Sequence, residues 1–233
     1  MQLDKEIDGT INIGGVLKFS TLDYPGKISA VIFCQGCPNR CVYCHNPEFI
    51  PLKHTTDIKF SDIYNFLETR RGLLDAVVFS GGEPLMQDGL RDAIDCIKGM
   101  GFLIGLHTSG YNPERLSEVI PLIDWVGLDI KTTFDKYEEI TKNDISGHMA
   151  EKSFKILLRS NISNEVRTTL DSRYITLEDL KRIAKTLTEH GVAKWVLQEC
   201  ILREAGIDKR LGMISDTALE ALNKIINIEI RRQ

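Results

Sequence analysis

Three cysteines within one short stretch are the side chains of this chain best suited to chemistry. Cys37, Cys41 and Cys44 follow the spacing C-x3-C-x2-C, which lets three thiolates converge on one small group. Cysteine thiolates hold the irons of iron–sulfur clusters, and a [4Fe–4S] cluster held by only three of them keeps one iron free for another ligand. The spacing therefore predicts a [4Fe–4S] cluster with an open iron.

Structural zinc is the alternative interpretation of the same cysteines. Zinc in such sites normally takes four protein ligands, often as two separated C-x2-C pairs, and no distant second pair exists here. His45 directly follows Cys44, which is too close for the usual spacing of zinc ligands. Of the other cysteines, Cys34 and Cys96 are expected to be buried structural side chains, whereas a role of Cys200 in the site stays open.

The overall composition narrows the classes of protein to which the chain can belong. With 233 residues, 42% hydrophobic and 27% charged, it is long enough for one α/β domain with a sizeable core. The net charge of -4 argues against nonspecific binding to nucleic acids, which needs basic residues to neutralise phosphates. The N-terminus lacks the pattern of a signal peptide, and no run of about 18 apolar residues could span a membrane. We therefore expect a cytoplasmic protein, in which clustered cysteines stay reduced and serve as ligands.

Apolar runs alternate with amphipathic segments along most of the chain. We expect strands at residues 28–33, 76–79, 102–106, 125–128, 165–170 and 194–197. We expect helices at residues 61–71, 89–100, 113–120, 151–160, 177–190 and 215–229. Near-continuous apolar strands separated by helices predict an α/β fold with a parallel sheet covered by helices. An N-terminal hairpin or extension over residues 1–24 is expected to precede a single core domain over residues 25–233.

The remaining polar motifs lie where these strands end. Gly81-Gly82-Glu83-Pro84 follows the second strand, and His107 follows the third. Asp129 and Lys131 follow the fourth strand, and Arg167 lies in the fifth. Folds of this kind bind their ligands at the carboxyl ends of the parallel strands. The positions therefore predict one site at that edge of the sheet, beside the cysteine loop.

Two of these motifs together resemble the radical S-adenosylmethionine (radical SAM) superfamily. They are the C-x3-C-x2-C loop after the first strand, with Tyr43 before its last cysteine, and Gly81-Gly82-Glu83-Pro84 after the next strand. More narrowly, the stretch from Cys34 to Pro47 resembles the activating enzymes of glycyl-radical proteins. Within that group it is most similar to the activating proteins of anaerobic ribonucleoside-triphosphate reductases, and pyruvate formate-lyase activating enzymes look like close relatives.

The resemblance implies a fold, two cofactors and a reaction. The fold of such families is a partial (β/α)6 barrel that is similar to part of a TIM barrel. The open iron of their [4Fe–4S] cluster binds the amino and carboxylate groups of S-adenosylmethionine (SAM). One electron then cleaves SAM to methionine and a 5'-deoxyadenosyl radical, which abstracts hydrogen from a glycine of the partner.

The resemblance also implies roles for the residues at the strand ends. Gly81 and Gly82 would let the backbone approach the methionine part of SAM, and Glu83 would accept a hydrogen bond from its ammonium group. Lys131 would pair with the carboxylate of SAM, and Asp129 would be a polar or cation ligand. The alternatives are a tight turn with a surface acid for the first motif and a surface ion pair for the second.

Three further residues are candidates for contact with the cofactor. A buried arginine needs an anionic partner, so Arg167 either binds SAM or forms an internal salt bridge. His107 occupies the place where relatives often carry an aspartate that helps hold a monovalent cation, and a neutral imidazole is a poor ligand for such a cation. His107 is therefore expected to contact the cofactor or the partner instead. Tyr43 either shapes the adenine pocket or packs in the core.

The leading hypothesis is an oxidoreductase, a radical SAM activating enzyme for an anaerobic ribonucleotide reductase. Its electron donor would be flavodoxin or ferredoxin, and neither a nucleic acid nor a membrane is expected as a partner. One alternative is an activating enzyme of the pyruvate formate-lyase type. Others are a radical SAM enzyme acting on a small molecule such as a purine or pterin analogue, and a non-catalytic iron–sulfur or zinc protein.

Overall fold

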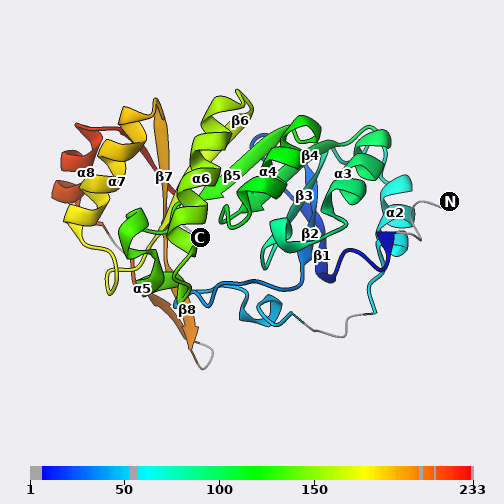
Figure 1. Ribbon diagram of the computed structural model, residues 1–233, viewed down its shortest axis with the longest axis horizontal. Helices are drawn as coiled ribbons and strands as arrows, with labels where there is room; N and C mark the ends of the chain where they lie inside the picture. The colour runs from blue at the N-terminus through cyan, green and yellow to red at the C-terminus, as the bar shows by residue number, and fades with distance from the viewer. Residues whose placement is uncertain (1–6, 53–56, 205–206, 213, 232–233) are drawn as a thin grey trace.

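An eight-stranded sheet forms the centre of the molecule (Figure 1). The computed structural model describes residues 7–52, 57–204, 207–212 and 214–231. The strands of the sheet, in spatial order, are β1 Ile13–Ser20, β2 Ser29–Cys34, β3 Ala76–Gly81, β4 Leu103–Thr108, β5 Trp125–Asp129, β6 Ser163–Leu170, β7 Lys194–Glu199 and β10 Asn227–Arg231. Two further strands, β8 Ile201–Glu204 and β9 Ile207–Arg210, form a separate antiparallel hairpin.

Strands β2 to β7 run parallel, and each one pairs with the next along the chain. They confirm the expected strands and the α/β class. The crossovers carry the helices α2 Phe60–Glu68, α3 Leu90–Gly99, α4 Pro113–Val119, α5 Tyr137–Thr141, α6 Ser146–Arg159, α7 Leu177–Glu189 and α8 Asp216–Asn223. Repeated strand–helix units with sequential parallel neighbours build the incomplete barrel that was expected.

The N-terminal segment extends this sheet by one strand. Strand β1 pairs antiparallel with β2, from Ile13 opposite Cys34 to Ser20 opposite Ser29. A turn that includes Gly26 at a φ of 68° connects the two strands. The division of the chain after residue 24 stays a prediction, and residues 1–6 of the expected extension lie outside the described part.

The other edge of the sheet differs from the prediction. The expected helix over residues 215–229 is wrong in its second half, because α8 ends at Asn223 and β10 pairs parallel with β7. In β10, Ile228 and Ile230 alternate with Asn227, Glu229 and Arg231. Alternation with a period of two favours a strand over a helix, and the neighbouring strand supplies the hydrogen bonds.

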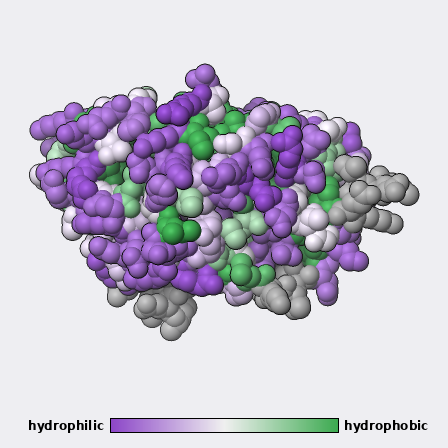
Figure 2. Space-filling model, viewed as in Figure 1, coloured by the Kyte–Doolittle hydropathy of each residue, from purple (hydrophilic) through white to green (hydrophobic). Residues whose placement is uncertain are grey.

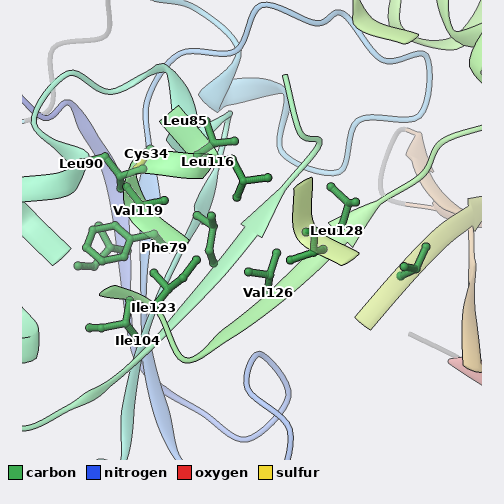
Figure 3. Packing of buried hydrophobic residues seen from close by; sticks show 14 of the residues in the cluster. Cys34, Phe79, Leu85, Leu90, Ile104, Leu116, Val119, Ile123, Val126 and Leu128 are labelled. Carbon is green, nitrogen blue, oxygen red and sulfur yellow. The ribbon is translucent and has the colours of Figure 1, made fainter. Parts of the chain in front are cut away.

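The main core lies between the sheet and its helices (Figure 3). Phe79, Ile104 and Val126 from the strands are fully buried, together with Leu90 of α3 and Leu116 of α4. Each such side chain stabilises the fold by about 1.5–3 kcal/mol relative to an exposed one. The face of the molecule shown in Figure 2 is mostly hydrophilic, with small, separate hydrophobic spots. Within the described ranges, no helix is long and apolar enough to cross a membrane.

A smaller apolar cluster fills the barrel at the amino ends of the strands. It contains Tyr24, Val31, Val78 and Trp125, and the rings of Tyr24 and Trp125 lie 5.6 Å apart. A Cβ on Gly105 would lie 3.1 Å from Cδ2 of Tyr24, so the glycine leaves room for this ring. These side chains occupy part of the barrel interior, whereas the candidate polar residues lie toward the carboxyl ends of the strands.

Candidate active site

The loop with the three cysteines runs from β2 to the short helix η1 (Pro47–Phe49). Backbone hydrogen bonds tie its two ends together, from Gly36 N–H to Phe49 O (2.8 Å) and from Cys37 N–H to Ile50 O (3.1 Å). All three cysteine side chains are partly exposed. The loop therefore presents three reachable thiols beside the carboxyl ends of the strands.

Cys34 is distinguished from these three cysteines by its burial. It forms a further C-x2-C pair with Cys37, a spacing that would also suit a fourth ligand. However, it ends β2 with 0% exposure among apolar side chains of the core (Figure 3). Burial, followed by the charge of Glu83, raises the pKa of its thiol. Cys34 is thus buried as expected, Cys200 is buried in the same core, and Cys96 packs against it.

The cysteine loop fits an iron–sulfur cluster in its chemistry. Burial, followed by the charge of Glu83, raises the pKa of Cys37 to about 12, and burial also raises the pKa of Cys44. Such thiols stay protonated unless a metal replaces the proton. The buried hydroxyl of Tyr43 has no hydrogen-bond partner among the described residues, which marks a polar position next to the cysteines. Among all described residues, no group of three or more His, Cys, Asp or Glu side chains is arranged so that it could hold a metal ion.

The glycine turn after β3 packs directly against the cysteine loop. Gly82 N–H donates to Cys34 O and Glu83 N–H donates to Gly36 O, both at 2.9 Å. A Cβ on Gly82 would lie 2.3 Å from Gly36 O, and Gly81 has a φ of 103°, which favours glycine. Contact between the two loops therefore requires both glycines, a reason that the sequence did not reveal. Binding of SAM by their backbone stays a prediction.

Glu83 has a carboxylate that is surrounded by donors from the protein itself. Its Oε1 accepts from Leu85 N–H (3.1 Å) and from the Thr108 hydroxyl (2.6 Å). Its Oε2 accepts from Ser109 N–H (2.9 Å) and from the Ser109 hydroxyl. Burial raises the pKa of Glu83, and these hydrogen bonds oppose the shift. At 1% exposure it is no surface acid; it ties the glycine turn to β4, and its contact with an ammonium group stays a prediction.

Asp129, at the end of β5, lies between two cations. Its Oδ1 accepts from Arg167 Nε at 3.0 Å, and its Oδ2 lies 3.7 Å from Lys131 Nζ. Burial acts to raise the pKa of Asp129, but the charges of Arg167 and Lys131 hold it below its usual value. Arg167 is 6% exposed, so the alternative of an internal salt bridge is present, whereas its contact with SAM stays a prediction. Within this trio, two cations share one carboxylate.

His107 is held at both nitrogens of its ring. Its Nε2 lies 2.9 Å from the carbonyl oxygen of Asp23 and therefore donates, which leaves Nδ1 to accept from the Ser80 hydroxyl at 3.5 Å. Burial, followed by the charge of Arg167, lowers the pKa of His107 to about 3. The ring also packs edge-on against Trp125, with centroids 5.4 Å apart. His107 is thus a neutral side chain held in place by hydrogen bonds and ring packing inside the barrel. Its contact with the cofactor or the partner stays a prediction.

The structure adds polar residues to the site that were missed in the sequence. Asn39, at 2% exposure, lies between two of the clustered cysteines and donates to the Ser109 hydroxyl at 3.4 Å. Asn143 in turn donates to Asn39 Oδ1 at 3.2 Å. Ser109 could have been found, because it follows His107 at a strand end, but no spacing pointed to Asn143.

Comparison with known proteins identifies the family. Residues 31–187 match the profile of the Radical SAM superfamily. The chain belongs to this superfamily. Among radical SAM relatives, the "Putative glycyl-radical enzyme activating enzyme MJ1227" of Methanocaldococcus jannaschii is 36% identical over 91% of this chain and 90% of the relative. Pyruvate formate-lyase 1-activating enzyme of Escherichia coli K12 is 32% identical over 63% of this chain and 62% of that enzyme.

A solved structure shows the same fold in a longer protein. Streptococcus suis SuiB bound to S-adenosylmethionine superposes with a TM-score of 0.62 at 12% identity, covering 84% of this chain. The chain spans 48% of the length of SuiB, so the likeness concerns the radical SAM fold and not the remaining half of that protein.

Membership in the radical SAM superfamily confirms the expected fold and cofactors, a [4Fe–4S] cluster and SAM. Cys37, Cys41 and Cys44 are the residues that would hold the cluster. When bound, the reduced cluster supplies the electron that cleaves SAM. The chain itself contributes partly exposed thiols, a carboxylate shared by two cations and a neutral imidazole at one end of the barrel.

Proposed function

We propose that this radical SAM enzyme activates a glycyl-radical protein by abstracting a hydrogen atom from one glycine of that partner. The observation that carries the proposal is the 36% identity to the Methanocaldococcus jannaschii relative, which extends over 91% of the chain. A match confined to the cysteine loop would speak only for the cofactors. This one extends over most of the chain and is therefore not confined to the cysteine loop.

Anaerobic ribonucleotide reductase is the partner that we favour. The support is the stretch from Cys34 to Pro47, which resembles the activating proteins of these reductases. A partner of the pyruvate formate-lyase type is the second candidate, supported by the 32% identity to the Escherichia coli enzyme. The reaction consumes one electron for each SAM cleaved, and we propose flavodoxin or ferredoxin as its donor.

The proposal assigns SAM to the carboxyl ends of the strands. Its carboxylate is placed beside Lys131, because Asp129 pairs with both Lys131 and Arg167 and one positive charge of this trio is left for a further anion. Its methionine end is placed along the backbone of the glycine turn. The Tyr43 hydroxyl, which no other described residue engages in a hydrogen bond, is available for a polar contact near the cluster.

Formation of a protein radical tests this function. The reconstituted enzyme, reduced under anaerobic conditions with SAM and a candidate reductase, should give a glycyl-radical EPR signal and an equal amount of 5'-deoxyadenosine. Two matched controls should give no radical: Cys41→Ala enzyme, and a reductase whose radical glycine is replaced by alanine. SAM cleavage without a radical on either type of partner, together with turnover of a small molecule, would contradict the proposal.

A further inference from the structure

A continuous line of side-chain hydrogen bonds connects the glycine turn with the segment between α5 and α6. The Ser109 hydroxyl donates to Glu83 Oε2, Asn39 Nδ2 donates to the Ser109 hydroxyl (3.4 Å), and Asn143 Nδ2 donates to Asn39 Oδ1 (3.2 Å). At the far end, Ile145 N–H donates to Asn143 Oδ1 at 3.3 Å. We refer to Glu83, Ser109, Asn39 and Asn143 as the polar relay.

The two ends of the polar relay determine its direction. The Glu83 carboxylate only accepts, so the Ser109 hydroxyl must donate to it and must itself accept from Asn39. Asn39 therefore turns its oxygen toward Asn143, which has to offer its NH2 group. The same NH2 group lies 3.3 Å from Pro38 O, a second acceptor in the cysteine loop. With a backbone N–H at one end and a carboxylate at the other, neither amide can flip without losing a hydrogen bond.

The backbone of the same segment holds the cysteine loop as well. Arg40 N–H donates to Thr141 O (2.7 Å), and Val42 N–H donates to Ile140 O (3.1 Å). These carbonyls belong to the last turn of α5, where a helix has no internal donors for them. In Figure 1 the loop, in blue, runs to α5 along the lower edge of the molecule. The cysteine loop is therefore held in place by α5, a helix that belongs to neither the cysteine motif nor the glycine turn.

We propose that Asn39 and Asn143 are positioning residues, which hold the cysteine loop in register with the glycine turn. SAM binds to the open iron of the cluster, so the two loops must be aligned with each other. The cysteine loop carries the proposed cluster ligands, and the glycine turn carries the backbone proposed to face SAM. A directed, partly buried chain of hydrogen bonds favours one relative placement of the loops over others. Glu83 and Asn39 are 1% and 2% exposed, so the members of the relay on the glycine turn and on the cysteine loop are shielded from water, whereas Ser109 and Asn143 are half-buried. The inference rests on the cofactors of the superfamily and not on the identity of the partner.

Asn143→Asp tests the polar relay at the position farthest from the cofactors. The substitution keeps the size and the oxygen that accepts from Ile145, but a carboxylate cannot donate to Asn39 or to Pro38. Asn164→Asp is the matched control, because the exposed Asn164 also donates its Nδ2 to a backbone carbonyl (2.9 Å), but at the start of β6.

The readouts are iron content, the EPR spectrum of the reduced cluster without SAM, and the half-conversion concentration. The last is the SAM concentration at which half of the cluster has changed from the SAM-free to the SAM-bound EPR spectrum. For Asn143→Asp we expect unchanged iron, an unchanged SAM-free spectrum and an increase of about tenfold in that concentration, the scale of one or two lost hydrogen bonds. The control should match the parent. An Asn143→Asp variant that also matches the parent would overturn the proposal. So would loss of iron, since Asn143 would then serve to retain the cluster rather than to align it.

Ser109 provides an independent test of the same relay. Ser109→Ala removes the middle hydroxyl and should raise the half-conversion concentration to a similar extent, whereas Ser109→Thr keeps the hydroxyl and should restore the parental value. In the double variant with Asn143→Asp, the increase should not exceed that of the larger single variant, because both interrupt one chain. Increases that multiply would mean that the two residues act separately, and the relay would be refuted.

Discussion

Replacement of Gly82 by alanine tests directly how the two loops of the site fit together. A Cβ there would lie 2.3 Å from Gly36 O and 2.7 Å from Phe49 O, and both are backbone atoms that cannot rotate away. Since ordinary contacts begin at 3.4 Å, the loops would have to separate by roughly 1 Å. That separation would stretch the hydrogen bond from Glu83 N–H to Gly36 O, which is 2.9 Å long.

The size and sign of the effect follow from these contacts. Overpacking of a buried position costs about 1–3 kcal/mol, and a weakened buried hydrogen bond costs about 1 kcal/mol more. We therefore expect Gly82→Ala to lower the free energy of unfolding by about 2–4 kcal/mol. Gly99→Ala is the matched control, because a Cβ at this last residue of α3 meets nothing within 4 Å. Alanine favours helix there, so the control should raise the free energy of unfolding by about 0.5–1 kcal/mol.

Urea unfolding of the metal-free chain, followed by circular dichroism, measures both variants. SAM binding by the cluster-loaded Gly82→Ala protein should weaken as well, because the glycine turn has moved away from the cysteine loop. A variant as stable as the parent would refute the close contact between the loops. A destabilised variant that binds SAM with parental affinity would refute the idea that this contact aligns the site.

Three further predictions concern titratable groups of the site. The pKa of His107 in the folded protein is about 3, below the ordinary 6.5, so keeping this ring buried and neutral costs stability in acid. The His107→Gln variant should therefore gain stability relative to the parent as the pH falls from 6.5 toward 3. A difference in urea midpoints that does not change with pH would contradict this. The Glu83→Gln substitution places an NH2 group against donors such as Ser109 N–H. The free energy of unfolding of this variant, measured in urea, should therefore fall by about 1–3 kcal/mol. Unchanged stability would exclude the buried carboxylate network. Lys131→Met should weaken SAM binding by the cluster-loaded protein roughly 10- to 100-fold in calorimetry, and unaltered affinity would exclude Lys131 as partner of the SAM carboxylate.

Most of the fold could be predicted because its signals are local. Strands β3, β4, β5 and β7 contain short apolar runs and end in glycine, polar or charged residues, and the segments between the strands carry helical periodicity. The error at the C-terminus has a physical reason. The segment around Ile228 and Ile230 becomes a strand by pairing with β7, and hydrogen bonds to a distant neighbour leave no mark in the segment itself.

The sequence by itself determined the chemistry of this protein. The predicted ligands Cys37, Cys41 and Cys44 lie in one loop, so their type and spacing indicate a cluster without knowledge of the fold. Only the tertiary structure decided how that loop is held. The hydrogen bond between Asn39 and Asn143 joins residues 104 positions apart. Three of the four donors to Glu83 come from Thr108 and Ser109, so they depend on which strand end lies beside it. Steric contacts and hydrogen bonds of this kind arise when the sheet brings separate loops together, and no local spacing encodes them.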